Sequence, residues 1–356
     1  MTWPHLTPLV ALGLGLVSRP VAPAGADAGL PDLLTSQPPR WTAPRRDAGL
    51  TLRLLWRSDT QRGAATLIYP IDVVFAAQGL AIYDHGEKHV QVVDAATGRA
   101  RFAVGRHGPG PGEFGDYAVT FFGPPSRALM VEALDGRVTA LEGDKLVPQR
   151  VPREQRWSSG CTWGSDRFLL QVHGNGAHDS FVVSTGDGAR IIDSVAAPWP
   201  RHRTLPFLVR QAPLRQLDDA TCAYLPVYQR EFAIISHKAP PMTGVHVEVL
   251  PEAREDIRGT RTRRVHSLAD GTKAGARDTA AWRDALLVSF WGTSPHRRRV
   301  LDVYDRRTLA YRGSLLVPHE IDHLAVHGDT LAVTAEVDDV PVVAVFLLGR
   351  SGTSAR

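Results

Sequence analysis

The sequence "HEIDH" at residues 319–323 has the spacing of a zinc-binding motif. On a helix, His319 and His323 would share one face and could bind zinc, with Glu320 as a general base. In a β-strand, residues four apart lie about 13 Å apart, which is too far for two ligands of one metal ion. The segment aligns with "YPIDVV" at residues 69–74 and continues into a strand pattern. We therefore expect a strand, with a metal site at His319 and His323 as the alternative.

The chain contains two cysteines, Cys161 in "SSGCTWG" and Cys222 in "DATCAYL". In an exported protein a disulfide between them is plausible, and it would stabilise the fold by about 2–4 kcal/mol. The alternative is a pair of buried free thiols. The sequence leaves both interpretations open.

Residues 103–119, "AVGRHGPGPGEFGDYAV", alternate glycine and proline before Glu113. Proline fixes φ and lacks an N–H group, and glycine tolerates positive φ, so neither a helix nor a paired strand can continue through this segment. Gly110–Gly115 satisfies the dinucleotide-binding pattern G-x-G-x-x-G, but such a site requires a helix directly after the glycines. Because Pro111 interrupts the turn and a strand pattern follows, we predict no cofactor.

We interpret this segment as a shaped connection between two sheets. The glycines and prolines would set its path, Glu113 would accept hydrogen bonds from loop amides, and Phe114 would wedge between the sheets. The residues with a predicted structural role are Gly108, Pro109, Gly110, Pro111, Gly112 and Phe114.

The N-terminus has the pattern of a targeting segment. The run "LTPLVALGLGLV" at residues 6–17 has the length of a signal-peptide core and is short for a membrane span. Small-residue cleavage sites follow it, so we expect a signal peptide over 1–28 and export to the periplasm or the extracellular space. A buried N-terminal strand or helix is the alternative. The Pro-rich residues 29–48 are predicted to be a linker, and residues 351–356 a disordered tail.

The sequence pI is about 9.3, and two runs, 258–266 and 296–299, are strongly basic. Such runs could attract polyanions, but solvated loops between strands are the simpler interpretation. Aromatic residues do not alternate with these basic residues as they do in single-strand nucleic-acid grooves. We therefore expect no specific nucleic-acid binding, and a polyanion-binding surface protein remains a further alternative.

From residue 50 onward, short runs rich in Val, Ile, Leu, Phe and Tyr recur between turn sequences, as at 79–84, 89–94, 285–291 and 342–348. No helical period of apolar residues persists, which indicates an all-β sandwich, barrel or propeller. The run "VHVEVL" at 245–250 is predicted to be one of these strands.

Internal repetition favours the propeller. "VQVVDAATGRARF" (90–102) and "VLDVYDRRTLAYRG" (300–313) share a strand, an Asp, a Thr and a returning strand, with Asp94 and Asp305 placed to form Asx-turns. Similar units begin near residues 69, 115, 158, 218, 280 and 319, at the spacing of four-stranded blades. The sequence predicts a six-bladed β-propeller over 49–350. Pairing of the first strand, 50–56, with the last blade would close the ring and remove exposed edges.

The segment "VGRHGPGPGEF" resembles the signature of bacterial six-bladed β-propellers related to NHL-repeat proteins, in which G-x-x-G-x-G-P-G-E-F ends one blade and begins the next. The next blade departs from the pattern, because Glu132 and Ala133 follow its valine strand where such repeats usually carry Asp. The third to fifth units match by strand spacing alone. The resemblance implies a fold and export, and it implies no particular reaction.

We therefore expect an exported, monomeric binding or scaffold protein without a transmembrane anchor after processing. Its ligand would be a protein, peptide or carbohydrate, held on the face where the inner strands begin. The candidate ligand-binding residues are Asp72, Arg106, His107, Glu113 and Asp322, for which turn capping or channel solvation is the structural alternative. The enzyme alternative is a zinc- or calcium-dependent lyase or hydrolase with ligands among the channel histidines, such as His107, His173, His237 and His319.

Overall fold

The computed structural model describes residues 44–116, 119–132, 137–149, 157–164, 167–172, 180–185, 190–196, 212–251, 253, 255–260, 263–292 and 295–351. The chain divides into two units, 1–37 and 38–356, and all described residues belong to the second. The predicted signal peptide 1–28 and residues 352–356 of the predicted tail lie outside them.

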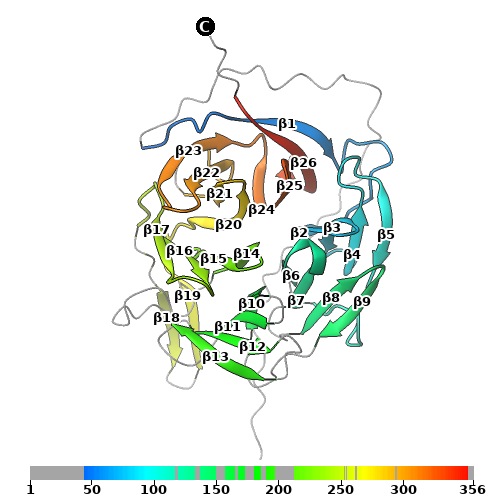
Figure 1. The fold of residues 1–356 in the computed structure, drawn as a ribbon, viewed down its shortest axis with the longest axis horizontal. Coiled ribbons are helices and arrows are strands. Elements are labelled where there is room, and N and C mark those ends of the chain that lie inside the picture. Colours follow the sequence, from blue (N-terminus) through cyan, green and yellow to red (C-terminus); the bar gives the residue numbers. More distant parts are fainter. Residues whose placement is uncertain are drawn as a thin grey trace, which may run out of the picture. The chain divides into compact units, whose positions relative to one another are not determined.

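The described chain forms six four-stranded antiparallel sheets arranged as blades around a ring (Figure 1). Blade 1 contains β2 (Pro70–Ala76), β3 (Gly79–Asp84), β4 (His89–Val93) and β5 (Ala100–Val104). Blade 2 contains β6 (Val119–Phe122), β7 (Leu129–Glu132), β8 (Val138–Glu142) and β9 (Lys145–Gln149), with a short 3₁₀ helix, η2 (Pro125–Arg127), between β6 and β7. Blade 3 contains β10 (Trp157–Thr162), β11 (Arg167–Val172), β12 (Ser180–Thr185) and β13 (Ile191–Ala196).

The second half of the ring repeats this order. Blade 4 contains β14 (Leu214–Asp218), β15 (Thr221–Tyr224), β16 (Glu231–Ser236) and β17 (Met242–Val245). Blade 5 contains β20 (Ala276–Trp282), β21 (Ala285–Phe290), β22 (Val300–Asp305) and β23 (Tyr311–Leu316), and blade 6 contains β24 (Glu320–His327), β25 (Thr330–Val337), β26 (Val340–Arg350) and β1 (Leu50–Arg57). The first strand of each of blades 1–5, together with β24, lies innermost. We call the face where these inner strands begin the entry face, and the opposite face the exit face.

The ring closes by pairing its two ends. β1 pairs antiparallel with β26, so that Leu52 lies opposite Leu348. The last blade thus receives its fourth strand from the beginning of the propeller, as predicted. The fold class, an all-β six-bladed propeller, is confirmed.

The core lies between the blades. Within the described residues, six clusters of buried apolar side chains occupy the six interfaces between neighbouring blades. Strands in the middle of a blade are covered on both sides, and every residue of β21 is buried. This explains why the sequence shows short continuous apolar runs rather than strict alternation.

The repeated Asp-x-x-Thr turns form as predicted. The Asp94 side chain accepts hydrogen bonds from the backbone N–H groups of Ala96 and Thr97 at 3.1 and 3.0 Å. In the related turn, Asp305 accepts from Arg307 and Thr308 at 2.9 and 2.8 Å. Each aspartate stabilises the connection between the third and fourth strands of its blade.

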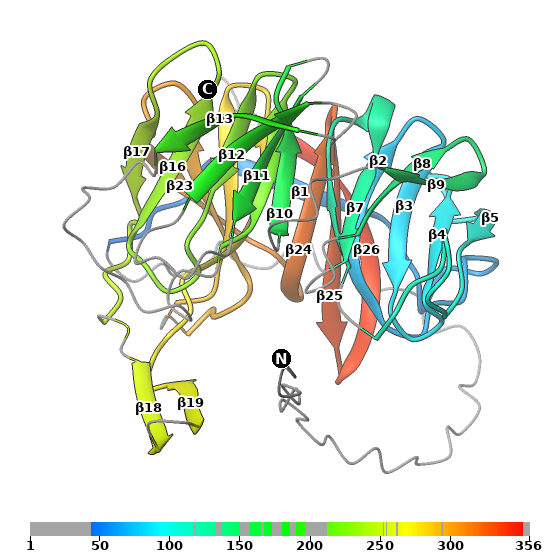
Figure 2. The ribbon, with the colours of Figure 1, turned by 90° about the horizontal axis from the view of Figure 1, so that it is seen from below.

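The region between blades 4 and 5 differs from the sequence prediction. The predicted strand 245–250 is wrong beyond Val245, because His246 turns into the core and stacks on Phe232 at 4.9 Å between ring centroids. The predicted basic loop instead contributes to a hairpin of β18 (Glu255–Thr260) and β19 (Arg263–Leu268). Figure 2 shows this hairpin standing apart from the blades.

The propeller includes the described end of the predicted linker. Residues 44–48 run beside blade 5, where Asp47 forms a parallel bridge with Ser314. A Cβ atom on Gly313 would lie 2.5 Å from the Cα of Ala48, so this approach requires glycine. Arg45 enters the core and contacts Asp302 and Glu248. We call these three charged residues the N-terminal latch.

Within the residues that the structure describes, no helix is long and apolar enough to cross a membrane.

Candidate functional site

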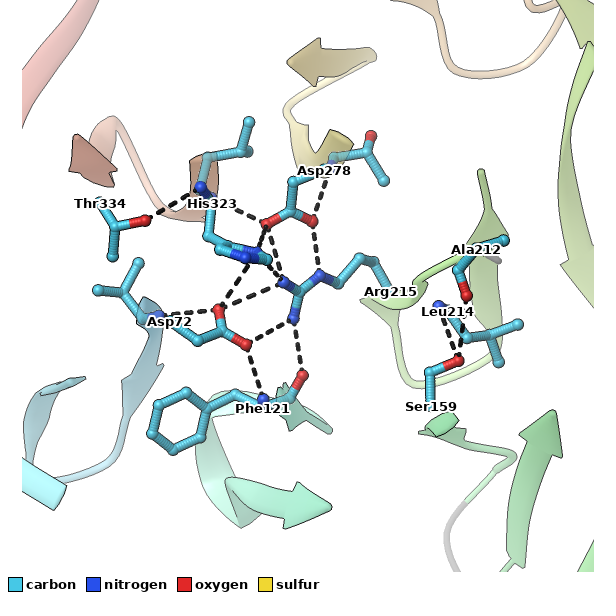
Figure 3. Close-up of polar contacts among 12 residues, drawn as sticks. Asp72, Phe121, Ser159, Ala212, Leu214, Arg215, Asp278, His323 and Thr334 are labelled. Atoms are coloured by element: carbon cyan, nitrogen blue, oxygen red, sulfur yellow. Dashed lines mark hydrogen bonds and ion pairs between the residues drawn. The ribbon is translucent and has the colours of Figure 1, made fainter. Parts of the chain in front are cut away.

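The centre of the propeller carries a cluster of charged side chains. The inner strands β2, β20 and β24 each contain a β-bulge near their start, and the residues directly after the bulges are Asp72, Asp278 and His323. A bulge redirects the following side chains, and here these three point towards the axis (Figure 3). Arg215 reaches the same point from β14. We call these four residues the axis network.

Arg215 joins blades on opposite sides of the ring. Its Nε donates to Asp278 Oδ1 at 2.5 Å and its Nη2 to Asp278 Oδ2 at 2.9 Å. Nη1 and Nη2 each donate to Asp72 at 3.2 Å, and Nη1 also donates to the carbonyl oxygen of Phe121 at 2.9 Å. All three charged residues are buried. One guanidinium group therefore links blade 4 with blades 1, 2 and 5.

The aspartates also bind the backbone of the following blade. Asp72 Oδ2 accepts from the N–H of Phe121 at 2.8 Å, and Asp278 Oδ2 accepts from Leu324 at 2.9 Å. In blade 3, Ser159 Oγ accepts from the N–H of Leu214 at 3.1 Å. The side chain after the bulge in blades 1, 3 and 5 thus fixes the inner strand of its neighbour (Figure 3).

Charge pairing keeps Asp278 and Arg215 ionised. Burial opposes ionisation of Asp278, but the charge of Arg215 and hydrogen bonds from His323 and Leu324 outweigh it and lower the pKa of Asp278 to about 2. Burial alone would lower the pKa of Arg215, whereas Asp278 and Asp72 raise it above its usual value. The network therefore holds two carboxylates and one guanidinium in the protein interior.

Asp72, Asp278 and His323 offer ligand atoms that all lie within 4.8 Å of one another. Carboxylate and imidazole groups at this separation could in principle bind zinc or calcium. Arg215 Nη2, however, lies 2.7 Å from His323 Nδ1 and within 3.2 Å of both aspartates. Because this cation fills the space between the three ligand groups, the side-chain arrangement does not fit a metal ion.

His319 does not join His323. The strand β24 begins at Glu320, so the HEIDH segment is extended, as expected. His319 Nε2 lies 3.2 Å from Arg57 Nη1, and burial together with Arg57 and Arg299 lowers the pKa of His319. The two histidines of the alternative metal site therefore contact different partners.

The Gly-Pro segment forms a closed loop between β5 and β6. The N–H of Gly108 donates to the Phe114 carbonyl at 3.0 Å, and the N–H of Phe114 donates to the Arg106 carbonyl at 2.8 Å. Phe114 is buried and packs edge-on against Tyr83, with ring centroids 5.0 Å apart. Its side chain belongs to the apolar cluster between blades 1 and 2.

Glu113 lies inside this loop. It accepts from the N–H of Gly110 at 2.8 Å and pairs with Arg106 at 2.7 Å, and both contacts lower its pKa. A Cβ on Gly108 or Gly110 would lie 2.2 or 2.8 Å from a Glu113 carboxylate oxygen, so it would displace this carboxylate from its contacts with Gly110 and Arg106. Pro109 and Pro111 confine φ at the residues between these glycines, and Gly112 adopts a φ of +72°.

The candidate ligand-binding residues lie in separate places. Asp72 belongs to the axis network, whereas Arg106 and Glu113 hold the loop. His107 is exposed and lies 3.2 Å from Asp116, and Asp322 pairs with Arg298 at 3.2 Å. The structure therefore brings Asp72 together with residues outside the predicted set, namely Arg215, Asp278 and His323.

The exit face contains a cleft of about 870 Å³ between turns of blades 2, 3 and 4. Its lining includes Pro124, Arg127, Trp163, Arg167, Asp219 and Lys238. His237, one of the candidate channel histidines, lies here instead, with its ring centroid 5.7 Å from that of Trp163. His173 lies outside the described residues. A smaller cavity of about 220 Å³ follows the inner strands from Arg215 towards the same face.

Covalent and polar contacts fix the wall of this cleft. Cys161 of β10 and Cys222 of β15 form a disulfide between blades 3 and 4. Gln216 Oε1 accepts from the backbone N–H of Thr162 at 2.7 Å, directly beside the disulfide. Because Thr162 also lines the cleft, these contacts fix the positions of blades 3 and 4 where they form the cleft wall.

Comparisons with known proteins show the fold. No family model matches the chain, and no curated protein matches its sequence. A solved structure from Bacteroides fragilis NCTC 9343, named a "Putative exported protein", has a TM-score of 0.57 at 10% identity, covering 87% of this chain and 97% of that chain.

Two further solved structures have lower scores. Virginiamycin B lyase from Staphylococcus aureus has a TM-score of 0.47 at 10% identity, covering 84% of this chain and 98% of that chain. BamB from Moraxella catarrhalis has a TM-score of 0.41 at 11% identity, covering 83% and 98%. At these scores and identities, neither protein supports an argument about the activity of this chain.

Proposed function

We propose that this chain is an exported binding protein without catalytic activity, and that it takes a peptide or a saccharide in the exit-face cleft. The observation that carries the proposal is the position of Arg215. Its guanidinium group occupies the space between Asp72, Asp278 and His323, whose ligand atoms lie close enough together to share a metal ion.

The groups around Arg215 are poorly suited to catalysis. A general base or a metal ligand must be able to face a substrate or an ion. Asp72 and Asp278 instead accept hydrogen bonds from Arg215 and from backbone N–H groups, and His323 contacts both Arg215 and Asp278. These contacts favour a structural role for the axis over the metal-dependent lyase or hydrolase.

The exit-face cleft supports the binding role. Its volume, about 870 Å³, lies within the range of ligand sites. Charged side chains of both signs line it, and Lys238 and Asp219 are exposed. Such a polar, open surface suits a peptide or a saccharide better than an apolar small molecule. The disulfide beside it reduces the conformational freedom lost on binding.

Three observations support export. The apolar run at residues 6–17 has the length of a signal-peptide core. The disulfide between Cys161 and Cys222 is typical of proteins that fold in an oxidising compartment. The similar Bacteroides fragilis structure is also named as an exported protein.

The test is a binding screen of the full chain on peptide and saccharide arrays, with and without EDTA. We expect a ligand that binds equally in both conditions, is recovered unchanged, and binds at least about tenfold more weakly to the Lys238→Glu variant. Lys145→Glu is the matched control, because Lys145 is also an exposed lysine but does not line the cleft. Conversion of the ligand to a product, or binding that requires a metal ion, would contradict the proposal.

A further inference from the structure

A second group of basic residues surrounds Trp291 on the entry face, where β21 ends. Three guanidinium carbons lie near the centroid of the indole ring: Arg298 at 4.9 Å, Arg277 at 5.5 Å and Arg297 at 5.9 Å. An aromatic face attracts one cation, but three positive charges at one ring also repel one another. The arrangement therefore requires negative charge nearby.

Carboxylates of the chain form direct ion pairs with only one of these arginines. Arg298 pairs with Glu320 at 2.6 Å, Glu336 at 3.1 Å and Asp322 at 3.2 Å. Arg277 and Arg297 form no ion pair with any residue that the structure describes. The Nε atoms of both Arg277 and Arg298 are buried and have no hydrogen-bond partner in the same part of the chain. A buried donor of a charged group without a partner is unfavourable.

The backbone explains how Arg277 comes to this position. In β20, Ala276 lies opposite Phe290 and Asp278 opposite Ser289, so Arg277 is the bulged residue without a partner. The corresponding bulge of β24 contains Asp322, which pairs with Arg298. The same backbone feature thus presents an acid with an ion pair in blade 6 and, among the described residues, a cation without one in blade 5.

We propose that Arg277, Arg297 and Trp291 form a binding site for an oxyanion with two negative charges, either free phosphate or sulfate or the phosphate monoester of a larger ligand. Guanidinium groups donate paired hydrogen bonds to such oxyanions, and two of them supply the charge of a dianion. The half-buried indole forms an apolar wall beside the site. Because this site lies on the entry face, it is independent of the exit-face cleft.

The test is titration calorimetry of the full chain with inorganic phosphate, sulfate, methyl phosphate and acetate at low ionic strength. We expect one saturable site for phosphate whose affinity falls as sodium chloride is added. Arg277→Gln and Arg297→Gln should each weaken phosphate binding at least about tenfold. Methyl phosphate that binds as well as phosphate indicates an ester-linked ligand, whereas weaker binding of the ester indicates a free anion.

Arg283→Gln is the matched control. Arg283 also lies over a tryptophan, Trp282, at 5.0 Å, but it pairs with Asp329 at 2.9 Å. This variant should bind phosphate within about twofold of the wild type. Phosphate should raise the Tm of the wild type and of Arg283→Gln more than that of the other two variants. If Arg277→Gln fails to fold, Arg297→Gln alone tests the site, because Arg297 is exposed and its substitution should not disturb the fold.

Equal phosphate affinity in the wild type and in Arg297→Gln would overturn the site. If acetate binds as tightly as phosphate, the site does not select anions with two negative charges.

Discussion

The axis network and the N-terminal latch each place one buried arginine between two carboxylates, yet the pKa shifts of Asp278 at the axis and of Asp302 in the latch have opposite directions. In the axis network the pKa of Asp278 falls to about 2. In the latch the pKa of Asp302 rises, because burial outweighs the effects of Arg45 and Ser314, and Glu248 opposes its ionisation. Both side chains are completely buried, so burial alone cannot explain the difference.

The charges and hydrogen-bond donors around each carboxylate explain it. Asp278 accepts two hydrogen bonds from Arg215 and further ones from the N–H groups of Thr279 and Leu324, and it also contacts His323. Asp302 accepts two from Arg45 and one from the Ser314 hydroxyl. Within the described chain, no backbone N–H group donates to Asp302. The charge of Arg215 and the contact with His323, followed by the backbone donor of Leu324, therefore lower the pKa of Asp278, whereas the charge of Glu248 raises that of Asp302.

Removal of the central arginine should have the largest effect. Arg215→Met leaves Asp72 and Asp278 buried without their cation, so we expect a loss of about 3–5 kcal/mol in the free energy of unfolding at neutral pH, measured by urea denaturation. The loss should be smaller near pH 4, because without Arg215 burial raises the pKa of Asp278, which can then be protonated. The wild type should keep the contribution of Asp278 above pH 4 and lose it as the pH falls towards 2.

Arg101→Met is the control for this comparison, because Arg101 pairs with Asp94 on the surface. It should cost less than about 1 kcal/mol. A triple variant, Asp72→Asn with Arg215→Met and Asp278→Asn, should recover part of the stability by removing the unpaired charges. Equal unfolding midpoints for Arg215→Met and Arg101→Met would show that the axis network does not hold the ring together.

The sequence predicts the fold far better than the axis network. Blade features such as the Asp94 turn and the strand that becomes β1 depend on short runs of residues, so a pattern reveals them. Asp72 is recognisable as a candidate, but its partner Arg215 is 143 residues away, and Arg215 and Asp278 are 63 residues apart. An isolated arginine in a strand carries no local signal of such contacts. The Asp after a bulge in "ARDTAAW" resembles "PIDVVFA", and this similarity could have identified Asp278.

Loss of the latch arginine should have a smaller effect. Arg45→Met removes the cation from Asp302 and Glu248, and we expect a loss of about 2–3 kcal/mol in the free energy of unfolding. The loss should be smaller than at the axis because the Glu248 side chain is partly exposed, at 11%, and can keep contact with solvent. Urea denaturation of Arg45→Met and Arg215→Met under the same conditions measures the difference.

The pH dependence of this loss sharpens the comparison. The pKa of Asp302 is higher in the folded protein than in the unfolded chain, where it is about 4. Its contribution to stability is therefore fully present below about pH 4 and is lost as the pH rises through the pKa of the folded protein. Arg45→Met should raise that pKa further, so its deficit should be larger at pH 8 than at pH 5. Arg46→Met is the control, since Arg46 is exposed and donates to backbone carbonyls of Tyr311 and Arg312. A deficit that does not change with pH would contradict our explanation of the latch.

The smallest effect should come from the single hydroxyl that supports Asp302. Ser314 Oγ donates to Asp302 at 2.6 Å, and Ser314→Ala removes this donor, so we expect a loss of about 1–2 kcal/mol in urea denaturation. Ser289 lies in the same blade and is equally buried, but its hydroxyl has no hydrogen-bond partner among the described residues. Ser289→Ala should therefore change stability by less than about 0.5 kcal/mol. If both serine variants lose the same stability, the Ser314 hydroxyl does not support the ionised form of Asp302.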